Sequence, residues 1–404
     1  MGSIWLYCIL FIIVLLSFLS TDGRAISVPE PPLTNESFQI NAAGATFPYP
    51  LIQKWITEYE NLYPNVQFNY QALGSGTGVK DFIGYEMDFD ASDAPLSKTE
   101  ASRAVDALHI PETIGAAVMA YNLPGIPSGM NLTGDVIANI YLGKINSWND
   151  SRIQSLNPSF QLPNQPITVI HRSDGSGTTF VFTDYLSKVS RDWSTLIGKG
   201  KSVSWPIGVG YPQNIGVAEA ILKNQYSIGY VELAYVLQHN MTCAKVLNGD
   251  GTTFVAPSED SISNAVKASS NMLPSSNGDW SNVSITNSPG NDSYPISSMT
   301  YLLVHQDLGK VPGMTKDKAQ AIIHLIYWTV NDGQSYSSSL QYVPLPDNIR
   351  EKDDEGLSTI TYNGQGLFNY QPAPEFGQIV PLMFTMSIIS AIVITYKAGL
   401  KLRS

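Results

Sequence analysis

The stretch ITVIHRSDGSGTTFVFTDYL, residues 167–186, contains the strand–loop–helix order that decides the fold class. Residues 167–170 are mostly β-branched, which favours a buried strand. A loop of small polar residues follows at 171–179, and apolar side chains within 180–186 then recur at helical spacing. A strand that leads through a Gly-rich loop into a helix is typical of α/β proteins.

The same order occurs elsewhere in the chain. Apolar periodicity predicts helices at 51–62, 79–83 and 319–330, and alternating or continuous apolar runs predict strands at 66–70, 87–91, 228–236 and 301–305. Residues 257–297 are rich in Ser, Asn and Gly with little periodicity, so we expect a surface excursion there. The alternation predicts an α/β architecture for the whole body.

Length and composition limit the classes of protein. The chain has 404 residues, 43% of them hydrophobic and 14% charged, with a net charge of −11. This length suggests about two domains, and the apolar content excludes a disordered chain. The acidic balance argues against nucleic acid as a partner, because nucleic-acid binders need a basic surface. Two cysteines exclude a disulfide scaffold and a cysteine-based zinc site.

The N-terminus has the features of a secretory signal peptide. Residues 4–19 are nearly continuously apolar, and Gly23 and Ala25 form a small-x-small pattern, so we predict a signal peptide at 1–25. An uncleaved signal anchor is the alternative. Cleavage removes one cysteine and leaves Cys243 alone, so no intrachain disulfide is expected. The Pro-rich residues 26–37 are predicted to be a linker.

The C-terminus resembles a stop-transfer segment. Residues 379–396 carry no charge and just reach the length of a membrane-spanning helix, and three cations follow at 397–404. We predict a stalk at 371–378, a transmembrane helix at 379–396 and a cytoplasmic tail at 397–404, with the lobes outside the cell. A buried core helix is the alternative. Without residues 1–25 and the tail, the net charge is −14.

Asn-x-Ser/Thr sites permit glycosylation but do not require it. Six occur, at Asn35, Asn131, Asn149, Asn240, Asn282 and Asn291.

Three loops of small residues each stand before a predicted helix: 45–47, 74–78 and 173–179. Helix N-termini expose unpaired N–H groups with partial positive charge, and Gly, Ser and Thr allow close approach and add donors. Together with Arg172, the three loops therefore predict an oxyanion site. Any one loop alone is better explained as an ordinary turn with a helix cap.

The sequence lacks the main catalytic and cofactor motifs. Neither the dinucleotide-binding nor the P-loop spacing is present, and Ser176 lacks the glycine that a nucleophile elbow needs two residues earlier. The histidines show no metal-ligand spacing. We therefore expect no cofactor, no metal and no catalytic residue. His171 is interpreted as structural, with a general base as the alternative.

Six motifs in one order resemble the phosphate-binding proteins of bacterial phosphate ABC importers. They are GATFP at 44–48, GSGTGVK at 74–80, DASDAPLS at 90–97, IYLGKINSW at 140–148, RSDGSGT at 172–178 and WPIG at 205–208. The resemblance covers roughly residues 38–350. It implies a type II periplasmic binding protein, with two α/β lobes joined by two extended crossovers. Lobe 1 would be 38–117 plus 300–370, and lobe 2 would be 118–299.

The resemblance also implies a phosphate site between the lobes, which close like a hinge. Donors would come from Thr46 and Phe47, from Ser75, and from Ser176, Gly177 and Thr178. Asp93 would accept the proton of phosphate, and Arg172, oriented by Asp174, would supply charge-assisted bonds. Two residues have simpler interpretations: Asp93 as the cap of a turn and Arg172 as a surface cation.

The expected function is therefore capture of inorganic phosphate by a membrane-tethered extracellular protein, for uptake or sensing, with no enzymatic activity. The expected partners are phosphate, the membrane through the C-terminal span, and a phosphate transporter or co-receptor. The chain lacks a lipid-attachment cysteine and ends in the predicted span, which leaves the coupling to an importer open. Alternatives are another oxyanion such as sulfate, a hydrolase, or a receptor or adhesion ectodomain not coupled to transport.

Overall fold

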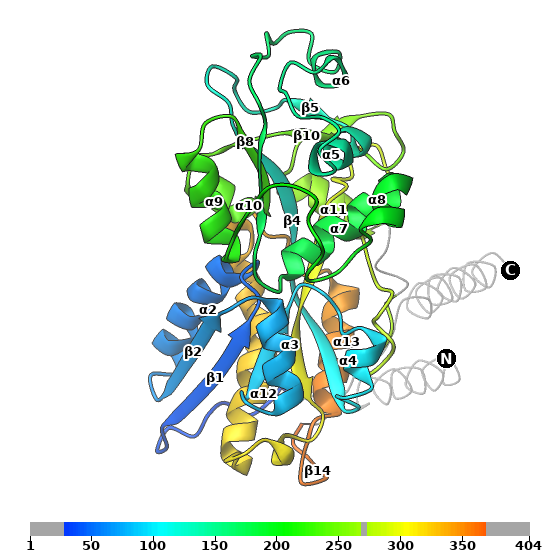
Figure 1. Ribbon diagram of the computed structural model, residues 1–404. Coiled ribbons are helices and arrows are strands. Elements are labelled where there is room, and N and C mark those ends of the chain that lie inside the picture. The colour runs from blue at the N-terminus through cyan, green and yellow to red at the C-terminus, as the bar shows by residue number, and fades with distance from the viewer. Residues whose placement is uncertain (1–27, 268–272, 369–404) are drawn as a thin grey trace, which may run out of the picture. The chain divides into compact units, whose positions relative to one another are not determined.

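The computed structural model describes residues 28–267 and 273–368 (Figure 1). Residues 29–368 belong to one compact unit. The predicted signal peptide, stalk, span at 379–396 and tail all lie outside the described residues. Within the described ranges, no helix combines the length and the apolar character needed to cross a membrane.

The first lobe is built on a mostly parallel group of strands. Strand β1 pairs in parallel with β2 on one side and with β3 on the other, while β12 runs antiparallel between β3 and β4. The elements are β1 (Phe38–Gly44), α2 (Tyr49–Leu62), β2 (Val66–Ala72), α3 (Ser75–Gly84), β3 (Phe89–Ser92), α4 (Lys98–Ala101), β12 (Ser297–His305), η2 (Leu308–Lys310), α12 (Lys316–Val330), η3 (Asp332–Tyr336), η4 (Ser338–Leu340), α13 (Asp347–Ser358), β13 (Thr361–Tyr362) and β14 (Gln365–Gly366).

The second lobe repeats the plan around β6, which lies in parallel between β7 and β8. Its elements are β5 (Asn131–Leu132), α5 (Gly134–Tyr141), α6 (Ser151–Gln154), β6 (Thr168–Arg172), α7 (Gly177–Val189), α8 (Arg191–Leu196), β7 (Val209–Tyr211), α9 (Gln213–Lys223), β8 (Ser227–Glu232), α10 (Leu233–Gln238), β9 (Thr242–Cys243), β10 (Lys245–Leu247), β11 (Phe254–Val255) and α11 (Glu259–Lys267).

Two extended segments connect the lobes. Strand β4 (Ala107–Asn122) pairs with β12 up to Ala116 and with β8 from Ala117 onward. The second connection enters β12, where the Ala117 N–H donates to the Ile296 carbonyl at 3.0 Å. The chain is therefore a two-lobed α/β protein with two crossovers, as expected. The residue boundaries assigned above to the lobes stay a prediction.

Helix α2 illustrates how the sequence builds a lobe. Leu51, Ile52, Trp55 and Tyr59 recur at three- and four-residue spacing, and all are buried on one face. Burial of each such side chain contributes roughly 1.5–3 kcal/mol. The Trp55 Nε1–H donates to the Gly333 carbonyl at 2.7 Å, which satisfies its one polar atom.

The segment 257–297 differs from the expected surface excursion. It contains helix α11, which contacts β4 and β12, and it buries Trp280 to 2% exposure. The Trp280 ring stacks on His109 at a centroid distance of 5.6 Å. The prediction was wrong because the buried apolar residues of α11, Ile262, Ala265 and Val266, are few and stand in a polar stretch of sequence.

The run 228–236 was expected to be one buried segment of strand character. The strand β8 instead ends at Glu232, whose carboxyl accepts the Ala234 N–H at 2.8 Å, and α10 begins there. A side chain that caps a helix N-terminus stops the strand although burial continues through Val236.

Candidate functional site

The site lies where several strands end and helices begin. Helices α2, α3, α7 and α9 follow β1, β2, β6 and β7, and within each lobe these strands run in parallel (Figure 1). Helix N-termini that follow parallel strands point to one edge of the sheet, where their N–H groups and partial positive charge converge. Of the three loops predicted from the sequence, 45–47 precedes α2 as expected. Helix α3 already begins at Ser75 and α7 at Gly177, so 75–78 and 177–179 form first turns of helices and not loops.

Arg172 is the last residue of β6 and is almost completely buried, with 1% of its side chain exposed. Its Nε donates to Asp174 Oδ1 at 2.8 Å, and its Nη2 donates to Asp174 Oδ2 at 2.5 Å. The third nitrogen, Nη1, donates to Thr178 Oγ1 at 3.4 Å. Arg172 is therefore not the surface cation that the sequence left open as an alternative.

Asp174 holds the guanidinium in place. Burial raises the pKa of Asp174, but the hydrogen bonds and charge of Arg172 outweigh burial, so its pKa lies below the usual value. The carboxylate also accepts the Gln213 N–H at 3.1 Å. Asp174 is thus an ionised partner that orients Arg172 and neutralises it.

Asp93 lies across the cleft, just after β3, and is 2% exposed. Its Oδ2 accepts from the Thr178 hydroxyl at 3.4 Å, while Oδ1 has no hydrogen-bond partner among the described residues. Burial raises the pKa of Asp93 to about 7, although Arg172, Thr178 and Ser75 act in the opposite direction. A buried acceptor without a partner is costly, so its presence here points to a ligand.

Backbone contacts bring the two Gly-rich loops together. The Gly76 N–H donates to the Gly175 carbonyl at 2.8 Å, which joins lobe 1 to lobe 2. A Cβ at Gly177 would lie 2.5 Å from both Asp93 Oδ2 and Ser75 Oγ. Only glycine therefore fits at position 177 in this arrangement.

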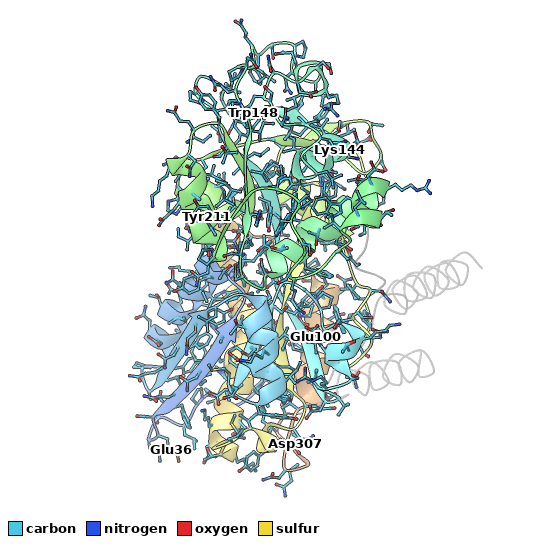
Figure 2. All side chains as sticks on the ribbon, in the orientation of Figure 1. Glu36, Glu100, Lys144, Trp148, Tyr211 and Asp307 are labelled. Atoms are coloured by element: carbon cyan, nitrogen blue, oxygen red, sulfur yellow. The ribbon has the colours of Figure 1, made fainter. Side chains whose placement is uncertain are left out.

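The hydroxyls of Ser75 and Ser176 both accept hydrogen bonds from backbone N–H groups. Ser75 Oγ accepts the Asp93 N–H at 3.1 Å, which positions the segment that carries the unpartnered carboxyl. Ser176 caps α7 by accepting the Thr179 N–H at 3.0 Å, and its own N–H donates to the Lys201 carbonyl at 2.8 Å. Lys201 also pairs across the cleft with Glu100, labelled in Figure 2, at 2.7 Å.

Thr46 and Phe47 are buried before α2, but their contacts differ. Thr46 Oγ1 accepts from Asn214 Nδ2 at 3.0 Å, a bond that crosses from lobe 1 to lobe 2. The Phe47 carbonyl accepts from the Tyr342 hydroxyl at 2.7 Å, and a Cβ at Gly115 would lie 2.6 Å from the Phe47 ring. The recorded contacts of Phe47 thus involve none of the other predicted site residues.

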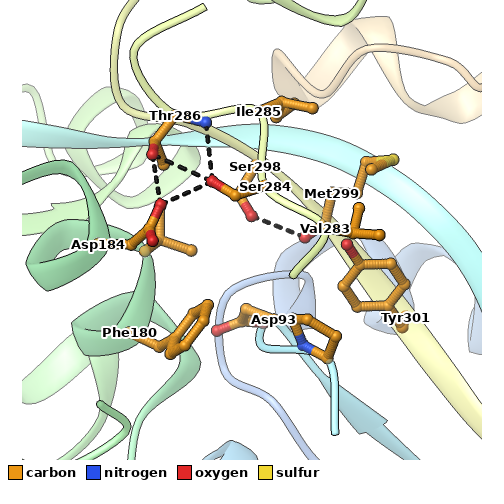
Figure 3. A pocket seen from close by; sticks show the side chains of 12 residues that line it. Asp93, Phe180, Asp184, Val283, Ser284, Ile285, Thr286, Ser298, Met299 and Tyr301 are labelled. Carbon is orange, nitrogen blue, oxygen red and sulfur yellow. Dashed lines mark hydrogen bonds between the residues drawn. The ribbon is translucent and has the colours of Figure 1, made fainter. Parts of the chain in front are cut away.

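Figure 3 shows a small cavity with Asp93 on its wall. Its volume, about 10 Å³, is close to what one water molecule needs. The lining also includes Asp184, which accepts from Ser284 and Thr286 at 2.6 and 2.5 Å and from Lys199 at 2.6 Å. The Asp184 carboxylate is therefore already compensated, whereas Asp93 is not.

The structure also bears on metals and on His171. In the described ranges, no group of three His, Cys, Asp or Glu side chains is arranged to hold a metal ion. His171 Nδ1 lies 2.9 Å from the Arg172 carbonyl, and its ring stacks on Trp205 at 4.7 Å. Burial lowers the pKa of His171. These contacts favour the structural interpretation of this histidine.

The structure thus connects seven of the nine predicted residues through direct contacts or through Asn214, whereas the hydrogen bonds of Phe47 and Ser176 involve none of the others. Sequence reasoning missed Asn214, which bridges Thr46 and Thr178, and Tyr230, whose hydroxyl contacts the Arg172 N–H at 3.1 Å and Thr179 Oγ1 at 2.6 Å. A fourth strand–loop–helix unit contains Asn214, because β7 ends at Tyr211 (labelled in Figure 2) and α9 begins at Gln213. Recognition of this unit in the sequence could have drawn attention to Asn214.

Comparisons with known proteins identify the relatives. A family model described as a PBP superfamily domain matches residues 29–332. The phosphate-binding protein PstS of Pasteurella multocida is 41% identical over 326 residues, covering 79% of this chain and 90% of the relative. The protein of the same name from Methanocaldococcus jannaschii is 35% identical over 354 residues, covering 84% and 90%.

Solved structures agree with the fold. A high-affinity periplasmic phosphate-binding protein bound with phosphate superposes with a TM-score of 0.62 at 20% identity, covering 83% of this chain and 99% of that one. A phosphate-binding protein from Stenotrophomonas maltophilia gives 0.55 at 18% identity, covering 78% and 92%. The relatives are binding proteins, and the chain is not an enzyme. By family model and by identity over most of its length, the chain belongs to the PBP superfamily, in the family of the phosphate-binding protein PstS.

Proposed function

We propose that the protein captures inorganic phosphate between its lobes, as the binding component of an ABC-type phosphate transport system, and performs no covalent chemistry. The observation that carries the proposal is the pairing of two buried groups on opposite lobes. Arg172 offers a fixed guanidinium, and Asp93 offers a free acceptor oxygen, with Thr178 in contact with both.

The two groups together favour phosphate over other oxyanions. Arginine is suited to tetrahedral oxyanions because its planar fork donates in fixed directions. Near neutral pH phosphate retains at least one proton, which Asp93 Oδ1 can accept, whereas sulfate has no proton to give. A charged and unpaired Asp93 would repel sulfate. The relatives named as phosphate-binding proteins support this assignment.

We propose Thr46, Phe47, Ser75, Ser176, Gly177 and Thr178 as further donors. Thr46, Ser75, Ser176 and Thr178 are buried polar residues, and Gly177 begins α7. Helix N-termini supply partial charge without a net positive surface, which suits an acidic protein. Asp174 neutralises Arg172, so these donors would carry much of the binding.

Titration calorimetry of the purified protein tests this function. Inorganic phosphate at pH 8 should give saturable binding to one site, and arsenate, which also retains a proton, should compete. Sulfate should give no measurable heat at the same concentrations. Absence of phosphate binding, or tighter binding of sulfate, would overturn the proposal.

We further propose that the lobes are extracellular and tethered by the apolar segment 379–396, with uptake or sensing as the output. The uncharged length of that segment and the cations after it support the tether. Protease added to intact cells should remove the lobes and leave a small membrane-bound fragment. Full protection of the lobes would contradict this topology.

A further inference from the structure

Asn214 lies in the first turn of α9, fully buried at the contact between the lobes. We propose that Asn214 is a positioning residue that fixes the direction of two hydroxyl protons, so that Thr46 donates to the bound anion and Thr178 donates to Asp93. The inference rests on the proposed phosphate site and adds a determinant of its specificity.

The orientation of the Asn214 amide follows from one neighbour. The backbone N–H of Glu232 lies 3.0 Å from Asn214 Oδ1, and a backbone N–H can only donate. The atom that faces Glu232 must therefore be the oxygen of the amide. The nitrogen, with two hydrogens to donate, then faces the two threonines.

Thr46 has its acceptor capacity filled. Its Oγ1 accepts from Asn214 Nδ2 at 3.0 Å and from the Asn214 N–H at 3.3 Å. A hydroxyl oxygen has two lone pairs and one proton, so the proton must be donated to another group. In the described part of the chain, no acceptor is recorded for it. A ligand oxygen in the cleft would supply one.

Thr178 is constrained in the same way from the other lobe. Its Oγ1 accepts from the second hydrogen of Asn214 Nδ2 at 3.1 Å and from Arg172 Nη1 at 3.4 Å. Its proton is directed toward Asp93 Oδ2, 3.4 Å away on the opposite side of the cleft. Both hydroxyl protons are thus turned away from Asn214.

One amide therefore joins a lobe 1 hydroxyl and a lobe 2 hydroxyl, and this bridge is complete only when the lobes meet. Thr46 then presents its hydroxyl proton to the anion, and Thr178 holds the carboxyl of Asp93 in place. A carboxylate in place of the amide would accept from the threonines and reverse both hydroxyls, although its size is the same.

The test compares Asn214→Asp with Asn214→Ala by phosphate titration at pH 8. A hydrogen bond to a charged group is worth about 10- to 100-fold in affinity, and Asn214→Asp would turn the Thr46 proton away from the anion and the Thr178 proton away from Asp93, so it should weaken phosphate binding by about 100-fold. Asn214→Ala leaves the hydroxyls free to rotate toward the anion and should lose about 10-fold. Gln213→Glu adds the same charge one residue away and also removes the bond from Gln213 Nε2 to the Ala72 carbonyl, so its loss sets an upper limit on the effect of charge, and it should lose less affinity than Asn214→Asp.

A double-mutant cycle separates proton direction from charge repulsion. In a Thr46→Val background, Asn214→Asp has only one hydroxyl to reverse, so its penalty should shrink by about 10-fold or more. If charge repulsion alone weakened binding, Asn214→Asp would lose the same fold in phosphate affinity in the wild type and in the Thr46→Val background. Equal penalties, or Asn214→Ala as weak as Asn214→Asp, would overturn the inference while wild-type binding keeps the proposed function intact.

Thermal unfolding of each variant shows whether it folds. If Asn214→Asp does not fold, the cycle of Asn214→Ala with Thr46→Val replaces it. Thr46→Val should then cost less in the Asn214→Ala background than in the wild type, and equal costs would overturn the inference. A wild-type protein that binds no phosphate would overturn both the proposed function and this inference.

Discussion

Asp174 and Asp93 are two aspartates beside the same arginine, yet they differ in charge state. Asp174 on lobe 2 makes two charge-assisted bonds to Arg172, and its pKa lies below the usual value. Asp93 on lobe 1 reaches Arg172 only through Thr178, and burial raises its pKa to about 7. Direct pairing therefore fixes one carboxylate as a structural anion, and burial without pairing leaves the other free to respond to a ligand.

The two faces of the cleft thus divide the work of recognition. In the proposed site both faces supply helix N-termini, and the lobe 2 face adds the neutralised Arg172. We propose that the lobe 1 face adds an acceptor, Asp93, that admits a protonated anion and repels an unprotonated one.

Removal of the Arg172 side chain should cause the largest loss of phosphate affinity among the variants considered. Truncation of one partner of a buried charge pair typically costs about 2–5 kcal/mol, so we expect Arg172→Ala to weaken phosphate binding by that amount. Arg152→Ala is the matched control, because Arg152 also pairs with an aspartate two residues away but has 46% of its side chain exposed. Calorimetry should show no change for Arg152→Ala. An unchanged affinity in Arg172→Ala would place Arg172 outside the site.

Asp93→Asn should stabilise the ligand-free protein at alkaline pH. The folded-state pKa of Asp93, about 7, lies above its unfolded value near 3.8, so the folded state binds the proton more tightly. The free energy of unfolding therefore falls as pH rises from about 4 to 7. Asparagine does not titrate. The free energy of unfolding of Asp93→Asn should therefore gain on that of the wild type as pH rises over this window, by at most about 4 kcal/mol.

Thermal unfolding of both proteins at pH 5 and pH 8, without phosphate, measures this difference. A larger advantage of Asp93→Asn at pH 8 than at pH 5 is expected. The same advantage at both pH values would mean that Asp93 does not titrate in this range.

Gly177→Ala should weaken closure of the two faces on each other. The added methyl group would meet Asp93 Oδ2 and Ser75 Oγ at 2.5 Å, and overpacking of this kind typically costs about 1–3 kcal/mol. We expect phosphate affinity to fall by that amount. Gly366→Ala, where a Cβ meets open space, is the control and should bind like the wild type. Similar affinities for the two variants would show that the lobes need not approach this closely.

The ion pair between Lys201 and Glu100 should contribute least to phosphate affinity. It joins the lobes at 2.7 Å, but both side chains remain partly exposed, at 16% and 23%. Such pairs are worth about 0.2–1 kcal/mol and weaken with salt. Glu100→Gln should therefore reduce phosphate affinity only a few-fold at low salt, and the difference from wild type should disappear at 1 M salt. A large loss that persists at high salt would indicate a direct role in binding.

The sequence predicts the residues of the lobe 2 face better than the role of Asp93 on the lobe 1 face. Arg172 and the Gly-rich loops are recognisable because small residues before a helix form a local pattern. The burial of Asp93 and its missing partner are not local, because they depend on Ser75, Thr178 and Gly177 from other elements. Asn214 escaped notice for the same reason: its partners Thr46 and Thr178 are 168 and 36 residues away.

The fold shows the same limit. Strong apolar periods, as in α2, predicted helices correctly. The short, mostly polar α11 and the buried Trp280 were missed, because their burial depends on contacts with β4, β12 and His109. The local sequence pattern therefore predicts helices and strands, whereas the packing of distant segments determines which buried polar groups remain without hydrogen-bond partners.

The role of Asp93 is tested most directly by paired titrations of the wild type and Asp93→Asn with phosphate and with sulfate, at pH 8 and one ionic strength. An ionised carboxylate accepts the proton of phosphate and repels sulfate, so the wild type should prefer phosphate by at least about 100-fold. Asparagine can donate to an unprotonated oxygen and carries no charge, so Asp93→Asn should narrow that preference markedly. Equal phosphate-to-sulfate ratios in the two proteins would contradict the assignment of selectivity to Asp93.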